Sequence, residues 1–357
     1  MRSRDSKDCS NRMVKNILIS VKWFIKRYVI LLLCLILYLL WTDTGKTRSF
    51  RSDSASLPVV TTTIDSFTTT EGTTEQTTEQ IVHSYSFKYL HLPPQMCEKS
   101  GAPMDPFLMI LVKSSVMNIG HREAIRLTWG RFNNTNIKLV FMLGYSELIK
   151  QYVNMENSLY NDIVQQDFVD DYFNNTIKTI MAFNWVVTFC PETKFVFFVD
   201  DDYFVNLPQI LSYLDKNVKI KTKNLIAGYK YIGGVVRRKR DSKWYVSEED
   251  YPNSTWPPYI SGGSMVMDFK VAKRIHDKIP FIKPLFIDDV YLGIVAQALN
   301  IELWNERKFE VHYLSNNLGN LFSAHSYGPP SKLIFEWKRV KCQHKQLFQT
   351  LYSLPDC

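Results

Sequence analysis

The chain has 357 residues, of which 45% are hydrophobic and 22% charged, so it can bury the core of one large or two modest globular domains. Its formal net charge is +8, but residues 1–41 carry +6 of it and leave only +2 for the rest. The basic excess is therefore a property of the N-terminal segment. This distribution argues against a nucleic-acid-binding surface, and we expect no nucleic-acid partner.

An uncharged, Leu-rich run, YVILLLCLILYLLW, follows the basic segment and covers Tyr28–Trp41. It is short for a membrane span, which needs roughly 17–25 residues, but Lys26 and Arg27 can extend their side chains to the interface. A cleaved signal peptide is the alternative, although no small-x-small cleavage motif follows. The basic flank predicts a cytosolic tail (1–27) and a signal-anchor helix (28–42), in a type II orientation. A span this short favours the thin membranes of the early secretory pathway.

The next segment contains TTTIDSFTTTEGTTEQTTEQ (residues 61–80), which has too few apolar residues to build a core. We interpret residues 43–90 as a flexible lumenal stem and residues 91–357 as a lumenal catalytic domain. Three N-x-S/T sequons agree with lumenal exposure and are predicted N-glycosylation sites: Asn133, Asn174 and Asn253. Two disulfides in any of three connectivities, or free thiols, are open to Cys97, Cys190, Cys342 and Cys357.

From residue 106 the hydrophobic pattern alternates between strands and helices. Strands are predicted at 106–115, 137–144 and 195–199, and helices at 120–130, 146–166 and 174–190. This order predicts an α/β fold of Rossmann type, with a mostly parallel sheet flanked by helices. In the second half, 256–268 is predicted as a Pro-rich segment, a Gly turn and a strand, and 286–301 as a segment that starts with two acids and continues as an apolar helix. Arg237–Arg240 is predicted as a solvated loop.

Three aspartates end the buried strand in FVFFVDDDYFVN (residues 195–206). Adjacent carboxylates repel one another and are costly to bury, so either water or a cation must cover them. In an extended segment the side chains of Asp200 and Asp202 point the same way, and Asp201 points to the other face. Ligands bind beyond the carboxyl ends of strands in such sheets. The pair therefore predicts a site for a hard cation, Mn²⁺ or Mg²⁺.

Four segments occur in the order REAIRLTWG, FVFFVDDDYFVN, KWYVSEEDYP…WPPYISGG and IDDVYLGI. They resemble the motif blocks of the β1,3-galactosyltransferase / β1,3-N-acetylglucosaminyltransferase family, over roughly residues 95–345. The resemblance implies a GT-A-like fold and a metal-dependent, inverting β1,3-glycosyltransferase of the Golgi membrane. Its donor would be UDP-galactose or a UDP-N-acetylhexosamine, and its acceptor a glycan on lipid or protein.

The resemblance also implies roles for individual residues. Asp289 falls on the general base that takes the proton of the acceptor's 3-hydroxyl. The implied metal ligands are Asp200, Asp202 and His325, the implied donor contacts are Arg122, Arg126 and Asp201, and the implied acceptor contacts are Trp256, Tyr259, Gly262, Gly263 and Asp288. Several of these residues also have a purely structural interpretation. Arg122 and Arg126 could form ion pairs, Trp256 could pack in the core, and His325 could be an ordinary core or surface histidine. Asp288 and Asp289 could simply start a helix, because acids favour its N-terminus.

The sequence departs from the family pattern at two places. Asp288 stands where the family usually has Glu, and Ser264-Met265 replaces the Gly-Tyr that commonly ends the S-G-x-G-Y motif. These changes bear on sugar preference. The main rival function is a catalytically silent, glycan-binding lumenal relative, which the intact Asp200, Asp202 and Asp289 oppose. A metal-dependent phosphatase lacks a second acid/Lys constellation, and a glycosidase would need no nucleotide-binding metal.

Overall fold

The computed structural model describes residues 80–93, 96–99, 102–220, 224–314 and 316–353. The predicted cytosolic tail, the signal anchor and most of the stem lie outside these residues. Within the described ranges, no helix is long and apolar enough to cross a membrane.

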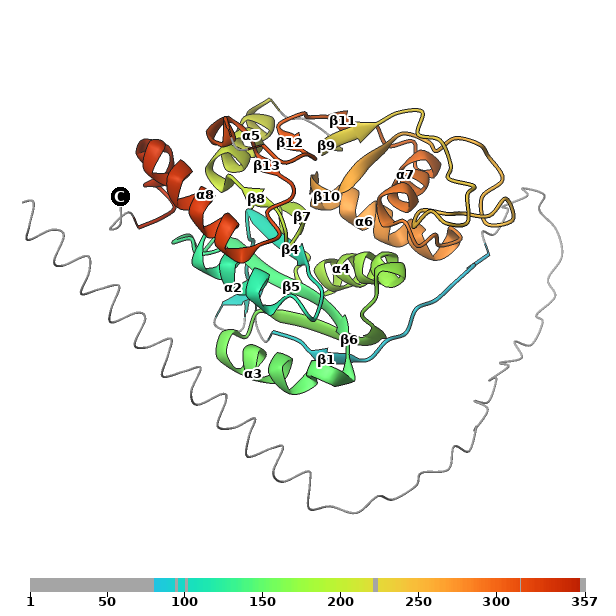
Figure 1. The fold of residues 1–357 in the computed structure, drawn as a ribbon, viewed down its shortest axis with the longest axis horizontal. Helices are drawn as coiled ribbons and strands as arrows, with labels where there is room; N and C mark the ends of the chain where they lie inside the picture. Colours follow the sequence, from blue (N-terminus) through green and yellow to red (C-terminus); the bar gives the residue numbers. More distant parts are fainter. Residues whose placement is uncertain (1–79, 94–95, 100–101, 221–223, 315, 354–357) are drawn as a thin grey trace, which may run out of the picture. The chain divides into compact units, whose positions relative to one another are not determined.

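A central sheet of eight strands, in the order β1-β6-β5-β4-β7-β10-β9-β11, organises the described part of the chain (Figure 1). Its four middle strands, β6, β5, β4 and β7, are parallel, as the alternation of strands and helices predicts. The bounds are β1 (Tyr89–His91), β4 (Leu108–Lys113), β5 (Ile137–Tyr145), β6 (Ile163–Val169), β7 (Phe195–Asp200), β9 (Ile226–Tyr231), β10 (Tyr259–Asp268) and β11 (Trp304–Asn305).

The flanks of the sheet are mixed, so the prediction of a mostly parallel sheet holds for its centre and for the edge pair β9–β11, but not for the remaining flanking pairs. β10 is antiparallel to both β7 and β9, and β1 is antiparallel to β6. No crossover helix lies between β9 and β10; a loop over residues 232–258 returns the chain, and such a connection leaves neighbouring strands antiparallel.

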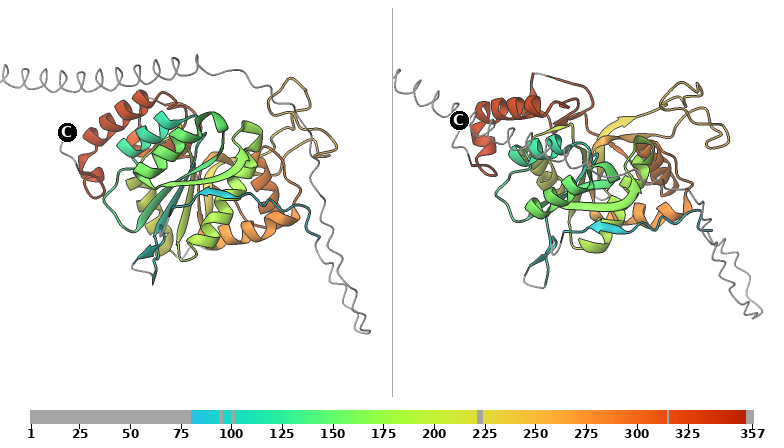
Figure 2. Two further views of the ribbon diagram at one scale, coloured as in Figure 1. Left: turned by 90° about the horizontal axis from the view of Figure 1, so that it is seen from below. Right: turned by 60° about the horizontal axis from the view of Figure 1, so that its bottom comes forward.

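Helices cover both faces of the sheet (Figure 2). One core contains residues of α2, α3, α5 and α8, and the other contains residues of α4, α6 and α7. The helices are α2 (Ile119–Leu127), α3 (Lys150–Tyr160), α4 (Asn175–Phe189), α5 (Leu207–Lys219), α6 (Phe269–Lys278), α7 (Asp288–Ala298), α8 (Pro330–Gln343) and α9 (Lys345–Phe348), with 3-10 turns η1 (Glu147–Ile149), η2 (Tyr172–Asn174), η3 (Ile279–Phe281) and η4 (Leu318–Asn320).

A smaller sheet has the strand order β12-β13-β8. Its strand β8 follows the aspartates at the end of β7, and its other two strands come from the C-terminal part of the chain. Its strands are β8 (Phe204–Val205), β12 (Phe309–Glu310) and β13 (Ser323–Ala324), and a hairpin of β2 (Glu98–Lys99) and β3 (Ala102–Pro103) precedes the central strands. A disulfide joins Cys97 to Cys190, and Cys342 is disulfide-bonded as well. The structure therefore selects the connectivity that contains Cys97–Cys190.

Two sequence predictions are wrong in detail. Residues 146–166 do not form one helix, because β6 begins at Ile163. Two glutamines inside β6 hide the strand pattern; Gln165 is buried and its side-chain Nε2 donates to the carbonyl of Gly144 at 2.7 Å. The predicted Gly turn at 262–263 is also absent, because both glycines lie inside β10.

The last residues of the predicted stem pack against the domain. The amide of Val82 donates to the carbonyl of Pro280 at 2.9 Å, and the amide of Lys88 donates to Asp167 Oδ1 at 2.9 Å. Tyr85 and Phe87 contact the core that contains α4 and α6. Residues 82–91 therefore form a strap along the described domain, and we use this name for them below.

Candidate active site

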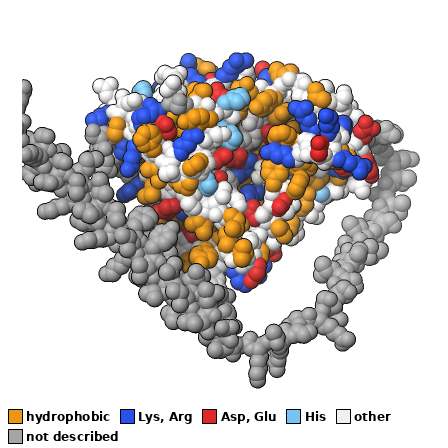
Figure 3. All heavy atoms as spheres, viewed as in Figure 1, with side chains coloured by type: hydrophobic (Ala, Val, Ile, Leu, Met, Phe, Trp, Pro, Cys, Tyr) orange, Lys and Arg blue, Asp and Glu red, His pale blue; other side chains and the backbone are white. Residues whose placement is uncertain are grey.

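The carboxyl ends of β4 and β7 meet at an acid-lined pocket of about 430 Å³. Lys113 ends β4 and pairs in register with Asp200, which ends β7. The pocket is lined by Asp200, Asp201 and Asp202 together with residues of β4, η2 and α4. Figure 3 shows acidic, basic and histidine side chains close together near the middle of the face that it presents. The pocket lies where ligands bind in sheets of this kind.

Lys113 connects the aspartates of β7 to the start of α7. Its Nζ lies 3.1 Å from Asp200 Oδ1 and 2.7 Å from Asp288 Oδ2, and its side chain is 2% exposed. Burial opposes the charge of Lys113, but the two carboxylates raise its pKa, so it stays an ammonium. Burial likewise opposes the charge of Asp288, yet Lys113 and the hydroxyl of Thr179, which donates at 2.8 Å, hold its pKa below the usual value. Asp288 is therefore ionised and fixed in place.

The surroundings of Asp289 shift its pKa in the direction opposite to that of Asp288. Burial and the adjacent charge of Asp288 raise its pKa to about 7. The amide of Val290 donates to its Oδ1 at 2.8 Å, and the amide of Gly262 approaches its Oδ2 at 3.4 Å. A carboxyl group that titrates near neutral pH and is oriented by backbone amides is suited to general base catalysis.

The glycines of β10 permit close approach and do not form a turn. A Cβ on Gly262 would lie 3.1 Å from the Cβ of Asp289 and 3.3 Å from Asp288 Oδ1. A Cβ on Gly263 would lie 2.3 Å from the hydroxyl of Tyr203. Gly262 therefore brings β10 against the start of α7, and Gly263 makes room for a buried tyrosine next to the aspartates.

Asp202 and His325 lie together, as the resemblance implies. His325 Nε2 is 3.0 Å from Asp202 Oδ2, and the His325 ring lies 5.0 Å from the Tyr203 ring. The hydrogen bond to Asp202, against the opposing effect of burial, raises the pKa of His325. Among the described residues, no three His, Cys, Asp or Glu side chains converge on one point as a metal centre. The carboxylate and imidazole of this pair fit two ligands of a hard divalent cation, whose other ligands a diphosphate and water can supply.

Asp201 points away from that pair, as the strand geometry predicts. Its Oδ2 accepts from the hydroxyl of Ser114 at 2.6 Å and from Asn118 Nδ2 at 3.0 Å. These bonds fix the loop that follows β4 against the end of β7. The polar contacts of Asp201 are thus within the protein, although it borders the pocket.

Arg122 and Arg126 do not direct their guanidinium groups into the pocket. All five donor positions of Arg122 are used: it is fully buried and donates to Glu156 at 2.8 and 2.7 Å, to Ser114, and to the carbonyls of Ser115 and Val116. Arg126 donates to Glu156 and, through two nitrogens, to Asp162. The geometry favours the ion-pair alternative, in which Arg122 positions the loop after β4 and Arg126 joins α2 to Glu156 and Asp162.

Of the two aromatic residues that the resemblance implies as acceptor contacts, one is a core residue and the other lies next to the candidate base. Trp256 is 7% exposed and packs on Tyr251, with ring centroids 4.5 Å apart, so it belongs to the core. Tyr259 is half-buried and stacks on Tyr231 at 5.2 Å, and the nearby charge of Asp289 contributes, after burial, to raising its pKa to about 12. Tyr259 thus remains next to the candidate base.

The three sequons lie on the outside of the domain. Asn133 and Asn253 are exposed, and Asn174 is half-buried at the N-terminus of α4, where its Nδ2 donates to the carbonyl of Val169 at 2.9 Å. Thr176, in the same sequon, is buried and donates to the carbonyl of Leu285. The glycosylation of all three stays a prediction.

Sequence reasoning missed Lys113, Lys178 and Thr179. Lys178 lines the pocket, is buried, and donates to the carbonyl of Ser114 at 2.6 Å and to Asp170 Oδ1 at 2.9 Å. A lysine that ends a buried strand, as in LMILVK, is a usable signal for Lys113, because a buried ammonium requires an anionic partner. Lys178 and Thr179 carried no such signal, since both lie within the helical pattern of α4.

Comparisons with known proteins agree on one family. The sequence model of the galactosyltransferase family, described as "Galactosyltransferase", matches residues 120–307. The chain is 35% identical over 266 residues to "Beta-1,3-galactosyltransferase brn" of Drosophila melanogaster, covering 71% of this chain and 80% of that protein. It is 35% identical over 274 residues to "Beta-1,3-galactosyltransferase 2" of Mus musculus, covering 72% of this chain and 63% of that protein.

Solved structures of other glycosyltransferases are more distant. Mouse xyloside xylosyltransferase 1 aligns with a TM-score of 0.33 and 10% identity, covering 62% of this chain and 97% of that one. The WbbM bifunctional glycosyltransferase aligns with a TM-score of 0.38 and 14% identity, covering 69% of this chain and 52% of that one.

Proposed function

Because the chain belongs to the galactosyltransferase family, we propose that it transfers galactose from UDP-galactose to the 3-hydroxyl of a glycan acceptor, with inversion and formation of a β1,3 linkage. The observation that carries this proposal is a pair of adjacent carboxylates beside an acid-lined pocket, whose surroundings shift their pKa values in opposite directions. Asp288 is held ionised by Lys113, and the pKa of Asp289 is raised to about 7.

In the proposed mechanism the acceptor binds against β10 and the start of α7. Asp289 accepts the proton of the 3-hydroxyl, and the oxygen attacks the anomeric carbon from the face opposite the UDP group, while the bond from that carbon to the β-phosphate oxygen breaks and UDP leaves with the electron pair. The amides of Val290 and Gly262 hold the Asp289 oxygens, and Asp288 and Lys113 fix the N-terminus of α7. Tyr259 forms part of the acceptor wall.

The donor diphosphate occupies the pocket at the ends of β4 and β7 in this proposal. Asp202 and His325, with Asp200 beside them, would hold Mn²⁺, or alternatively Mg²⁺. When bound, the cation offsets the charge that develops on the leaving UDP. Arg122 acts as a positioning residue, since its donors hold the Ser114–Val116 backbone that borders this pocket.

We also propose that the GT-A-like domain acts in the Golgi lumen, on a glycan of lipid or protein, and is tethered by the signal anchor at residues 28–42. The basic flank, the apolar run and the three sequons support this location. Residues 28–42 lie outside the described part of the chain.

The test is galactose transfer by the full-length protein, supplied with UDP-galactose, Mn²⁺ and a panel of β-linked acceptors. Asp289→Asn should lower kcat by about 100-fold or more, the usual contribution of a general base, while calorimetry shows unchanged UDP binding. Asp277→Asn, a change at an exposed aspartate of α6, is the matched control and should leave transfer unchanged.

Other outcomes count against the proposal in different ways. Full activity of Asp289→Asn would reject the base assignment. UDP binding without transfer to any acceptor would favour the catalytically silent relative, and absence of UDP binding would reject the transferase.

A further inference from the structure

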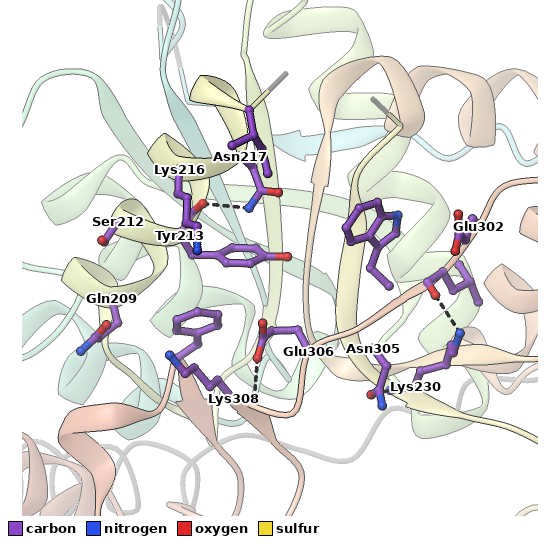
Figure 4. A pocket seen from close by; sticks show the side chains of 14 residues that line it. Gln209, Ser212, Tyr213, Lys216, Asn217, Lys230, Glu302, Asn305, Glu306 and Lys308 are labelled. Carbon is purple, nitrogen blue, oxygen red and sulfur yellow. Dashed lines mark hydrogen bonds between the residues drawn. The ribbon is translucent and has the colours of Figure 1, made fainter. Parts of the chain in front are cut away.

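A second hollow, of about 580 Å³, lies beside α5, the edge strand β11 and its neighbour β9 (Figure 4). It shares no lining residue with the acid-lined pocket at the ends of β4 and β7. Its volume falls within the ~300–1,000 Å³ that is usual for small-molecule sites. We call it the α5–β11 pocket.

Two aromatic side chains from different elements line this pocket and remain partly open to solvent. Trp304, on β11, is 40% exposed, although Leu303 before it, which also borders the pocket, is 8% exposed and belongs to the core that contains α4, α6 and α7. Tyr213, on α5, extends its phenol into the hollow and packs on Phe322 at 5.0 Å. An exposed tryptophan and a partly buried tyrosine that line one pocket provide flat apolar surfaces for a ligand.

The remaining lining is polar and mixed in charge. Three lysines line it, Lys216, Lys230 and Lys308, together with two glutamates, Glu302 and Glu306. The Nζ of Lys230 donates to the carbonyl of Leu303 at 2.9 Å, and the amide of Lys308 donates to Glu306 Oε1 at 3.2 Å. Asn305 adds an amide, whose Oδ1 accepts from the amide of Lys230 at 3.1 Å. An anionic ligand would therefore meet acids as well as lysines.

We propose that the α5–β11 pocket binds a neutral saccharide unit, separate from the sugars at the reaction centre. A pyranose ring has an apolar face, which fits Trp304 or Tyr213, and an equator of hydroxyl groups. Those hydroxyls both donate and accept hydrogen bonds, which matches the interspersed carboxylates, ammonium groups and amides. A nucleotide diphosphate would meet Glu302 and Glu306 as well as the three lysines, and the UDP probe below tests this alternative.

The pocket is connected to the candidate active site through two short segments. Phe322 lies three residues before His325, and Lys230 directly precedes Tyr231, which stacks on Tyr259. A longer glycan bound in this pocket would therefore contact the same strand, β9, that supports the acceptor wall. Binding here requires neither donor nor cation, so it can be measured whether or not the proposed transfer takes place.

The test is saturation-transfer-difference NMR with the full-length protein, without UDP or Mn²⁺. The probes are lactose, N-acetyllactosamine and chitotriose, with UDP as a nucleotide probe. We expect ring-proton signals from at least one saccharide, and at least a fivefold weaker affinity in Trp304→Ala. Ser212→Phe, which replaces one lining hydroxyl on α5 by a bulky ring but keeps both aromatic lining residues, should weaken binding to the same extent. Phe335→Ala, at a 65% exposed residue of α8, is the matched control and should bind within twofold of the parent.

Circular dichroism of each variant establishes whether it is folded. If Trp304→Ala does not fold, Ser212→Phe still tests the pocket. The proposal is overturned if no saccharide binds, or if binding survives both pocket variants, since the saccharide would then occupy another site. UDP signals lost in the same variants would also overturn it, in favour of a nucleotide site. Loss of saccharide binding with unchanged transfer to a small acceptor would support the pocket and leave the proposed enzyme intact.

Discussion

Replacing Lys113 by methionine should destabilise the protein more than any change to a surface ion pair. Lys113→Met keeps the length of the side chain but removes the cation between Asp200 and Asp288. Asp288 would then be buried, at 10% side-chain exposure, next to Asp289 without a counterion. The free-energy cost therefore arises from leaving one carboxylate buried and unpaired.

The magnitude follows from the burial of the two partners. Breaking a buried ion pair costs about 3–5 kcal/mol, and we expect about 3 kcal/mol because the Asp200 side chain is 37% exposed and water replaces part of its solvation. Without Lys113 the folded-state pKa of Asp288 should rise above its unfolded value. An acid with a raised folded-state pKa loses stability as pH rises, so the deficit relative to the parent should be larger at pH 8 than at pH 5.

The assay is urea unfolding of the parent, Lys113→Met, Asp288→Asn and the double variant at both pH values. The double variant removes both charges, and the cycle should give a coupling energy above about 1 kcal/mol. Lys273→Met is the matched control, since its partner Asp277 lies 2.7 Å away but both side chains are more than half exposed; we expect a loss below about 1 kcal/mol. A coupling energy near zero, or an equal deficit at pH 5 and pH 8, would refute the electrostatic role of Lys113.

Three other predictions concern catalysis, a buried arginine and the disulfide. The kcat/KM for transfer should rise with pH through about 7, because only ionised Asp289 accepts a proton; a profile that is flat from pH 5.5 to 8.5 would contradict this. Arg122→Lys should lower the free energy of unfolding by about 1–3 kcal/mol, since lysine keeps the charge but cannot reproduce the two bonds to Glu156; a urea midpoint equal to the parent's would contradict it. Serine at both Cys97 and Cys190 opens a loop of sequence separation 93 and should cost about 4–5 kcal/mol, measured by calorimetry; an unchanged Tm would show that the bond contributes nothing.

The sequence predicted the centre of the fold because local pattern and burial agree there. β4 and β7 are uninterrupted apolar runs, and α4 and α7 begin and end near the expected residues. The prediction failed at β6, where buried glutamines satisfy their polar groups through tertiary hydrogen bonds that no local pattern records. It also failed at Gly262 and Gly263, because their role depends on a helix and a tyrosine far away in sequence.

The residues of the candidate site also divide into those that a local pattern can predict and those that depend on tertiary contacts. Residues defined by position on one element, such as Asp200 at the end of a strand or Asp289 at the start of a helix, were predicted. The helical spacing of Arg122 and Arg126 correctly placed them on one side of α2, but it could not reveal that Glu156 accepts from both. Which carboxylate of Asp288 and Asp289 is ionised depends on Lys113, whose position is set by the register of β4 with β7.

The strap at residues 82–91 determines how the domain responds to a mechanical load. A pull on the chain from its N-terminal side reaches the domain first through the contacts of Val82 and Lys88, and only then through β1 on the edge of the sheet. Pro280 belongs to η3 and Asp167 to β6, so the strap passes the load to these two elements first. In the order β6-β5-β4-β7, β5 separates this attachment from the strands that carry the candidate site, so the load reaches those strands last.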